Sequence, residues 1–351
     1  WSHDLDIFGS GSLFQYLNRS CTRIGSAKLA AKLTNEPGSG NEIQDRQKMI
    51  NDLRERIDFR QEFTATGELV EEKADDLRDI SLWLNNRPYI SKYPWLFHLA
   101  LFSSLISLSM IIWVITDPSH FLRLLYPLVF NATLLSPFLL RTQRYQETIS
   151  KKHTLLLGYA RLLKLIAANK FEHHRLKENS RKAREAMHRL VKLSKLMQMF
   201  DQRLNMLLGA LLNSFFLFDF IMLFLLERWK RKHQQDILEW IELCGWTDAM
   251  ISLAGFAWNH PDYQLPVLLE QGADLQTRGL GHPRIPRQKR VDNDLEISKG
   301  KVVVITGANM AGKSTYLRSL GVNMVLAYAG CPVCATTFQG AYMSLHSSMR
   351  T

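Results

Sequence analysis

The stretch "VVVITGANMAGKSTYLRSLG", residues 302–321, decides how the C-terminal part of this 351-residue chain is expected to fold. Its first five residues, Val302–Thr306, are all β-branched, which favours a buried strand. From Ser314 the sequence is helical in character up to Gly330, and glycine is typical of a helix C-terminus. A glycine-containing turn lies between the two. The stretch therefore predicts a strand, a tight loop and a helix, which together begin an α/β domain.

The turn has the spacing G-x-x-x-x-G-K-[ST] of a phosphate-binding loop. Glycines let the backbone wrap around an anion without a Cβ clash, and the helix N-terminus directs N–H groups at phosphates. We expect Lys313 to contact the β- and γ-phosphates of ATP, and the Ser314 hydroxyl to hold Mg²⁺. These two are the candidate catalytic residues. The candidate ATP-binding residues are Gly307, Ala308, Asn309, Met310, Ala311, Gly312, Lys313, Ser314 and Thr315.

Hydrolysis requires a further carboxylate at a strand end, and no Asp or Glu follows Gly312. The run "FFLFDF", Phe215–Phe220, looks like such a strand but lies far upstream inside an apolar helical segment. The chain begins at Trp1 rather than Met, so we expect a piece of a longer protein. The sequence predicts ATP binding here, and ATPase activity only in the longer protein.

The positive charge is concentrated in one segment. The chain has 44 Lys and Arg against 33 Asp and Glu, and residues 141–203 alone hold 16 basic and 5 acidic residues. Such a segment attracts an anionic partner, either nucleic acid or an anionic lipid surface, and composition leaves both open, as it does a solvated helix face. Four cysteines are too few for a secreted disulfide framework. We interpret Cys331 and Cys334 as buried structural residues rather than half of a metal site.

Two apolar runs predict a transmembrane helical hairpin. The first is "WLFHLALFSSLISLSMIIWVIT", Trp95–Thr116, 22 residues without Lys, Arg, Asp or Glu. The second, Leu124–Leu140, adds 17 uncharged residues. Basic residues flank the outer ends of both runs, which places both ends in the cytoplasm by the positive-inside rule. They are Arg87, Lys92, Arg141, Arg144, Lys151 and Lys152.

A third apolar run, Leu204–Leu226, is long enough to span but contains Asp219, which costs about 2.5–3.5 kcal/mol inside a bilayer. We expect a buried core helix there. Two crossings keep the N-terminal region and the ATP site on the same, cytoplasmic face of the membrane.

Helical patterning dominates the rest of the chain. Residues 1–80 read as helices, with a turn at Asn35–Asn41, and the chain stays helical from Trp240 through "LCGWTDAMISLAGFAW". A heptad seam predicts packing against another helix; it comprises Ala186, Leu190, Leu193, Met197, Phe200, Leu204 and Leu207. Basic residues occupy much of the remaining circumference: Arg181, Lys182, Arg184, Arg189, Lys192 and Lys195. "DLEISKG" and "KVVVITG" predict a pair of strands that leads into the phosphate loop.

The phosphate loop and its flanks resemble the MutS family of DNA mismatch-repair ATPases. The similarity lies in "ITGANMAGKSTYLRSLG", in the lead-in "GLGHPRIP" and "VDNDLEI", and in "AYAGCPVCA". The N-terminal stretch "LDIFGSGSLFQYLNRSCTRIGSAKLAAKLTNEP" resembles the start of the MutS helical core. Ala308 and Cys334 stand where the family usually has Pro. The apolar hairpin departs from soluble MutS proteins, and the mismatch-reading F-x-E motif is absent from this sequence.

The resemblance implies a function and partners. It implies that Val291 packs against adenine with Asn293 beside it, that the protein binds DNA, and that a dimer completes its ATP sites. Its Walker-B carboxylates and switch residues have no counterpart in this chain. We therefore expect a membrane-attached, MutS-related DNA-binding ATPase. The alternatives are an ABC-type transporter ATPase and a non-catalytic nucleotide-binding membrane scaffold.

The expected fold is mainly α, with a MutS-like helical core and a transmembrane hairpin, followed by the start of an α/β P-loop domain. Four segments are expected: a core segment at 1–80, the hairpin at 81–140, a basic helical core at 141–270 and the N-terminal part of the ATPase domain at 271–351.

Overall fold

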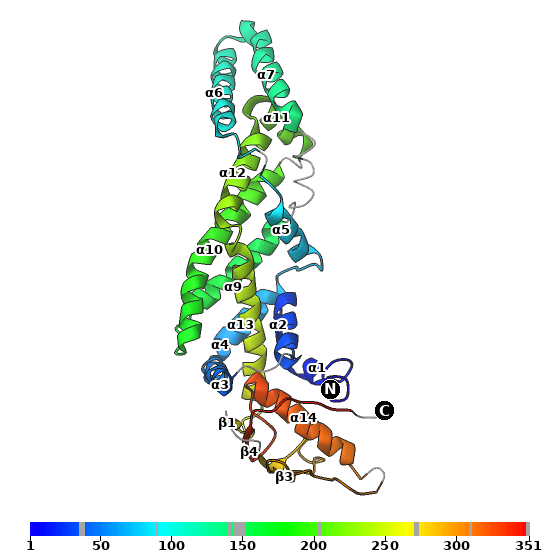
Figure 1. Ribbon diagram of the computed structural model, residues 1–351. Coiled ribbons are helices and arrows are strands. Elements are labelled where there is room, and N and C mark those ends of the chain that lie inside the picture. Colours follow the sequence, from blue (N-terminus) through cyan, green and yellow to red (C-terminus); the bar gives the residue numbers. More distant parts are fainter. Residues whose placement is uncertain are drawn as a thin grey trace. The chain divides into compact units, whose positions relative to one another are not determined.

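The computed structural model describes residues 1–34, 39–88, 90–138, 142, 152–202, 205–269, 274–308 and 311–348. Most of these residues are helical, and a single small sheet lies near the C-terminus (Figure 1), which confirms the mainly α prediction. The chain forms two compact units. The first comprises residues 1–68, 165–181 and 242–351, and the second comprises residues 69–164 and 182–241.

The first unit contains the expected N-terminal helices. They are α1 (Leu13–Leu17), α2 (Arg23–Thr34), α3 (Gly40–Arg54) and α4 (Ile57–Glu68). The residues from Asn35 to Gly38 of the predicted turn lie outside the described residues, and Gly40 already begins α3. The long helix α13 (Asp236–Asn259) confirms the helical prediction after Trp240.

Buried hydrogen bonds fix α2 against α13. The Asp248 carboxylate accepts from the Thr22 backbone N–H at 2.8 Å and from the Thr22 hydroxyl at 2.7 Å. The two helices approach closely because both carry glycine at the crossing: a Cβ at Gly25 would collide with Asp248, and one at Gly245 would collide with Ile24. This crossing anchors the N-terminal segment to α13, which precedes the sheet in the same unit.

The sheet of the first unit has four short strands in the order β1-β4-β2-β3. They are β1 (Val267–Leu269), β2 (Leu275–Leu280), β3 (Asn293–Ile297) and β4 (Thr337–Ala341). β1 and β4 pair in parallel, whereas β2 pairs antiparallel with both β4 and β3. Helix α14 (Lys313–Ala329) connects the predicted phosphate loop to the segment that enters β4.

The second unit contains the apolar hairpin. Its elements are α5 (Asp76–Asn85), α6 (Pro94–Thr116), the 3₁₀ helix η1 (Pro118–Leu124), α7 (Leu125–Leu135) and the 3₁₀ helix η2 (Ser136–Phe138). The segments Pro94–Thr116 and Pro118–Phe138 are each long and apolar enough to cross a membrane. Both are largely exposed along their length. Their two legs extend from the rest of this unit (Figure 1).

Two long helices follow the hairpin, α9 (Lys152–Ala168) and α10 (His174–Asp201). The heptad seam on α10 is buried from Ala186 to Phe200, as predicted. Leu204 of the predicted seam lies outside the described residues. Leu207 is exposed in the next helix, so its place in the seam was predicted wrongly. Arg181, Lys182, Arg184, Lys192 and Lys195 are exposed on α10. Arg189 instead lies 3.5 Å from Asp236.

The third apolar run is not the single helix that we predicted. It forms α11 (Met206–Phe216) and α12 (Phe218–His233), which are bent by 83°. Leu217 at the break has φ of +49°, a left-handed conformation that costs a β-unbranched residue about 1–2 kcal/mol and stops a regular helix. Helix α12 is largely buried, as expected of a core helix, whereas Leu207 on α11 is 79% exposed.

Candidate nucleotide-binding site

The predicted phosphate loop meets its helix at Gly312. This residue has φ of +86°, a left-handed conformation that favours glycine, and α14 begins at the next residue, Lys313. The helix ends at Gly330, where the Cys331 N–H donates to the Leu326 carbonyl at 2.9 Å in a Schellman-type cap. The loop-to-helix part of the prediction and both helix ends are confirmed.

Lys313 points back into its own loop. Its ammonium donates to the Gly307 carbonyl at 2.5 Å and to the Ala308 carbonyl at 2.6 Å. The side chain is therefore held at the mouth of the loop, where a phosphate group would be enclosed by the same backbone. Ser314 is exposed in the first turn of α14, and Asn309 and Met310 lie outside the described residues.

The strand predicted before the loop is absent. Residues 301–308 have no regular structure, and Val302 and Val304 are 86% and 77% exposed. β3 pairs with β2 rather than with this segment, so the predicted strand pair is also wrong. The β-branched run favours a strand only when neighbours pack against it. Within the described residues no strand lies beside it.

A cavity of about 490 Å³ lies between the loop and the lead-in segment. A volume of this size is typical of small-molecule sites. The cavity brings together predicted residues that are far apart in the sequence: Val291, Asn293, Ala311, Gly312, Lys313 and Thr315. Gly307, Ala308 and Ser314 are not among the residues that line it. The adenine-side and phosphate-side predictions therefore converge on one space.

Other residues of this cavity were missed by the sequence analysis. They are His282, Ile285, Lys289, Arg290, Asp294, Ile305, Thr306, Tyr316 and Ser319. Tyr316 ties the start of α14 to β3, because its hydroxyl donates to the Asp294 carbonyl at 3.1 Å. The segment "GHPRIP", which contains His282 and Ile285, could have pointed to two of them. Only the folded structure shows that this segment lies beside the loop.

His282 is neutral at physiological pH. Burial and the nearby guanidinium groups of Arg284 and Arg318 lower its pKa to about 4. The Arg284 backbone N–H donates to Nδ1 at 3.3 Å, so the ring hydrogen belongs on Nε2. The ring is therefore a neutral hydrogen-bond donor in the wall of the cavity.

This shift predicts a pH effect on stability. Between the unfolded pKa of about 6.5 and the folded value of about 4, the unfolded chain binds the proton of His282 and the folded chain does not. Its contribution to stability is therefore lost as the pH falls through this window. We expect the melting temperature of His282→Asn to fall less than that of the wild type when the pH is lowered from 7.5 to 5.

The matched control is Gln61→Asn, because Gln61 is exposed in the same unit and its side chain does not titrate. It should show the wild-type pH dependence in the same thermal scans. An equal loss of melting temperature in the His282 variant and the wild type would contradict the assignment.

A buried amide lies behind the cavity. Asn323 Nδ2 donates to the Gly281 carbonyl at 2.8 Å, and its Oδ1 accepts from the Cys334 N–H at 2.7 Å. Cys331 and Cys334 are themselves buried, and burial raises the pKa of the Cys331 thiol to about 12. Both observations favour the structural interpretation of the C-x-x-C pair.

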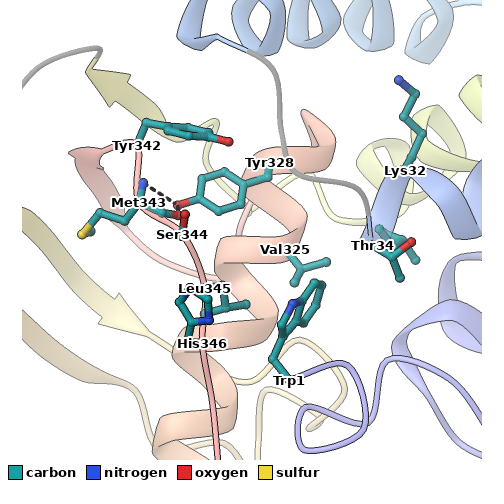
Figure 2. Close-up of a pocket in the computed structure, with 11 residues that line it drawn as sticks. Trp1, Lys32, Thr34, Val325, Tyr328, Tyr342, Met343, Ser344, Leu345 and His346 are labelled. Atoms are coloured by element: carbon teal, nitrogen blue, oxygen red, sulfur yellow. Dashed lines mark hydrogen bonds between the residues drawn. The ribbon is translucent and has the colours of Figure 1, made fainter.

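A second pocket of the same unit does not suit a nucleotide. Figure 2 shows Trp1, Val325, Tyr328 and the segment Tyr342–His346 around it. Its volume is about 90 Å³, below the size of small-molecule sites. The Tyr328 hydroxyl donates to the Met343 carbonyl at 2.8 Å, so the pocket marks where the C-terminal segment packs on α14.

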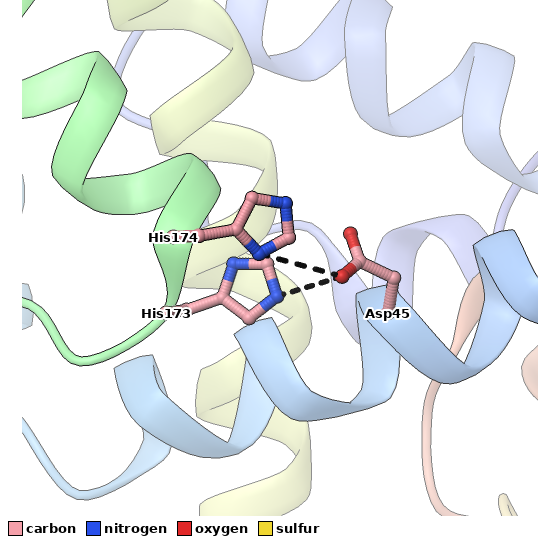
Figure 3. A group of neighbouring side chains, drawn as sticks. All are labelled: Asp45, His173 and His174. Carbon is pink, nitrogen blue, oxygen red and sulfur yellow. Dashed lines mark hydrogen bonds and ion pairs between the residues drawn. The ribbon is translucent and has the colours of Figure 1, made fainter.

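Asp45, His173 and His174 come close enough to resemble a metal site (Figure 3). The Arg175 N–H donates to His173 Nδ1 at 3.3 Å, which places the ring hydrogen on Nε2, where it donates to Asp45 at 2.9 Å. Both nitrogens of His173 are thus used in hydrogen bonds. We interpret the cluster as the link between α3 and the start of α10.

Comparison with known protein families found a match in the same part of the chain. Residues 303–347, which contain the loop, α14 and β4, match the family model of MutS domain V. This part of the chain is similar to the MutS family.

Several mismatch-repair proteins share the MutS similarity. DNA mismatch repair protein MutS 2 of Halobacterium salinarum is 44% identical over 91 residues, 25% of this chain and 10% of that protein. DNA mismatch repair protein MutS of Thermotoga maritima is 38% identical over 103 residues, 28% of this chain and 13% of that protein. Spellchecker 1 of Drosophila melanogaster is 37% identical over 90 residues, 24% of this chain and 10% of that protein.

The aligned segment covers about a tenth of each of these relatives. The similarity relates this segment to a part of DNA mismatch repair proteins.

Proposed function

We propose that this chain binds ATP and Mg²⁺ in the cavity at the N-terminus of α14. One observation carries the proposal: the cavity joins Gly312, Lys313 and Thr315 to Val291 and Asn293, which lie on a different segment. The first three residues suit phosphates because backbone N–H groups and an ammonium meet at a helix N-terminus. Val291 is 80% exposed, so its apolar surface is accessible to a base.

Each part of the site has a role in this proposal. Lys313 exchanges its loop carbonyls for the β- and γ-phosphates, and Ser314, exposed in the first turn, supplies the hydroxyl for Mg²⁺. Lys289 and Arg290 add positive charge along the wall. We propose ATP hydrolysis for the longer, dimeric MutS-type protein, in which further residues would supply the metal-binding carboxylates.

Isothermal titration with MgATP tests the nucleotide proposal. We expect saturable binding that weakens when EDTA removes Mg²⁺, because Mg²⁺ neutralises part of the negative charge of the phosphates in the site. The proposal would be ruled out if titration into the protein gave the same heat as titration into buffer alone. It would also be ruled out if binding did not saturate at millimolar ATP.

We propose that the hairpin attaches this protein to a membrane. Segments Pro94–Thr116 and Pro118–Phe138 have the length of spanning helices, and large apolar side chains on both are exposed, among them Leu105, Ile115, Leu122 and Val129. Basic residues flank the outer ends, and by the positive-inside rule they support a cytoplasmic position for the N-terminal region and the ATP site.

We propose DNA as the partner of the basic segment 141–203, and a dimer as the working form. The support for DNA is the exposed basic face of α10, in a protein related to DNA mismatch repair proteins. The dimer is proposed from the MutS resemblance.

The DNA proposal predicts a salt effect. Replacing Arg181, Lys182, Arg184, Lys192 and Lys195 by Gln should weaken duplex binding, measured by fluorescence anisotropy over a salt series. Each lost phosphate contact should reduce the slope of log K against log salt by about 0.9.

The matched control replaces two exposed lysines on other helices or turns, Lys48 and Lys73. It should leave the slope unchanged. If the wild type binds anionic vesicles but no duplex, lipid rather than DNA is the partner of the basic face.

A further inference from the structure

Helix α11 has the surface of a lipid-contacting helix although it is too short to span a membrane. No charged residue occurs from Asn205 to Phe218, and Leu207 and Leu211 are 79% and 59% exposed. Its 11 residues rise about 16 Å, about half of a hydrocarbon core of about 30 Å. We propose that α11 is a re-entrant helix embedded in the leaflet at which the hairpin begins and ends. This inference rests on the proposed membrane attachment.

The hairpin satisfies the carbonyl end of α11. Asn131 Nδ2 on α7 donates to the Ser214 carbonyl at 2.9 Å. The Ser104 hydroxyl on α6 lies 2.9 Å from the Phe216 carbonyl and 2.8 Å from the Ala100 carbonyl of its own helix, and these two acceptors share its one hydrogen. The last carbonyls of a helix lack partners within the helix. In hydrocarbon no water replaces these partners, so a helix can end there only when protein groups supply them.

The other side of the break is satisfied in the same way. The Asp219 backbone N–H at the start of α12 donates to Asn213 Oδ1 at 2.8 Å. The Leu217 N–H donates to the Asn213 carbonyl at 3.3 Å. Asn213 thus bridges the two helices across the 83° bend. A break closed by its own polar groups is the arrangement that a re-entrant segment requires.

The contacts place the break well inside the hairpin. Ser104 lies ten residues after Pro94 and twelve residues before Thr116, so it is about 15 Å and 18 Å from the two ends of α6. The buried Asn131 also accepts from the Ser103 hydroxyl, at 2.5 Å. If α6 spans the bilayer, α11 therefore ends near its middle.

Helix α12 leads the chain back toward the outer ends of the hairpin. Its first two turns belong to a core cluster with residues from those ends. The cluster comprises Ile90, Leu96, Ala100, Leu135, Phe138, Leu217, Phe220, Leu223 and Phe224. Beyond it the helix becomes charged from Glu227 onward. The chain therefore enters the bilayer through α11 and leaves through α12 on the same side.

Lipid is the occupant that fits the exposed face of α11. The face is continuous with the exposed apolar surface of the hairpin, because α11 packs on both α6 and α7. Acyl chains cover such a face without any polar partner, whereas a buried core helix would not leave Leu207 and Leu211 open.

Two measurements on the full chain in liposomes test the inference. First, an acyl-chain diazirine phosphatidylcholine is photoactivated with the unmodified protein, and adducts are located by mass spectrometry. We expect adducts in 206–216 and in 101–115, and none in 181–200 of α10.

Second, an impermeant maleimide reports the membrane side of three single cysteines, Ser119→Cys, Gln202→Cys and Lys232→Cys. All three positions are exposed. The background is Cys21→Ser, because the other three native cysteines are buried. We expect Gln202→Cys and Lys232→Cys to react from one side, and Ser119→Cys, in the hairpin turn, from the other.

The outcomes separate the two levels of the proposal. If Ser119→Cys reacts from the same side as Lys232→Cys, the hairpin does not span and the membrane attachment fails. If it reacts from the opposite side together with Gln202→Cys, α11 and α12 form a third crossing and only the re-entrant helix is overturned. The re-entrant helix would also be overturned if Gln202→Cys and Lys232→Cys reacted from the same side but no lipid adducts formed in 206–216. Protein rather than lipid would then cover α11.

Discussion

Lys313→Ala is expected to lower the affinity for MgATP by about 100-fold or more. The variant removes charge-assisted hydrogen bonds to the β- and γ-phosphates, each of which contributes about 1.5–3 kcal/mol, and 1.4 kcal/mol corresponds to a tenfold change. Isothermal titration with a non-hydrolysable ATP analogue and Mg²⁺ measures it. The affinity of Lys313→Arg should lie between those of the wild type and Lys313→Ala, because a guanidinium keeps the charge but replaces a compact ammonium by a planar fork.

The control for this prediction is Lys301→Ala. Lys301 is exposed and precedes the loop by six residues, so it tests whether any loss of positive charge near the site suffices. Its affinity should stay within about twofold of wild type. A fall of less than threefold for Lys313→Ala, with the variant folded, would remove the loop from the nucleotide site.

Asn323→Ala is expected to destabilise the first unit by about 3 kcal/mol. Truncation leaves the Gly281 carbonyl and the Cys334 N–H buried without their amide partner, and each such group costs about 1–3 kcal/mol. Urea unfolding followed by circular dichroism measures the loss. Nucleotide affinity should fall as well, since Gly281 precedes His282 in the wall of the cavity.

Leu317→Ala provides the comparison on the same helix. Leu317 is 43% exposed, so its truncation should cost no more than about 1 kcal/mol. Equal destabilisation by the two variants would show that α14 is sensitive to any substitution, and the special role of the Asn323 amide would be rejected.

Local patterns predicted α14, its glycine ends and the buried part of the α10 seam. Each of these features depends on the spacing of apolar residues along a helix or on the residue at its end, and both can be read from local sequence. Gly312 and Gly330 adopt the left-handed conformations for which glycine is suited. The cavity was predicted only in part: the motif identified Lys313, whereas His282 joins it through contacts between α14 and the lead-in segment, which no local period encodes.

The errors occurred where tertiary partners decide. Val302–Thr306 has strand propensity, but no described strand pairs with it. The run at 204–226 has the composition of one helix, yet its polar residue Asn213 accepts hydrogen bonds at a break whose partners, Ser104 and Asn131, lie on the hairpin. In a hydropathy average Asn213 only slightly lowers the value of an apolar run. The average contains no information about the hydrogen bonds by which this residue bridges two helices.

The position of Lys313 makes nucleotide binding an exchange reaction. In the free protein its ammonium is already solvated by the Gly307 and Ala308 carbonyls, so a phosphate must displace those two acceptors before it gains the lysine. The net gain is the difference between two sets of bonds to one cation, and inorganic phosphate alone should compete poorly. Mononucleotides that also reach Val291 and Asn293 gain contacts that displace nothing from the lysine. Discrimination between ATP and its phosphate fragments would therefore arise at the base, although the lysine is the residue that the motif identifies.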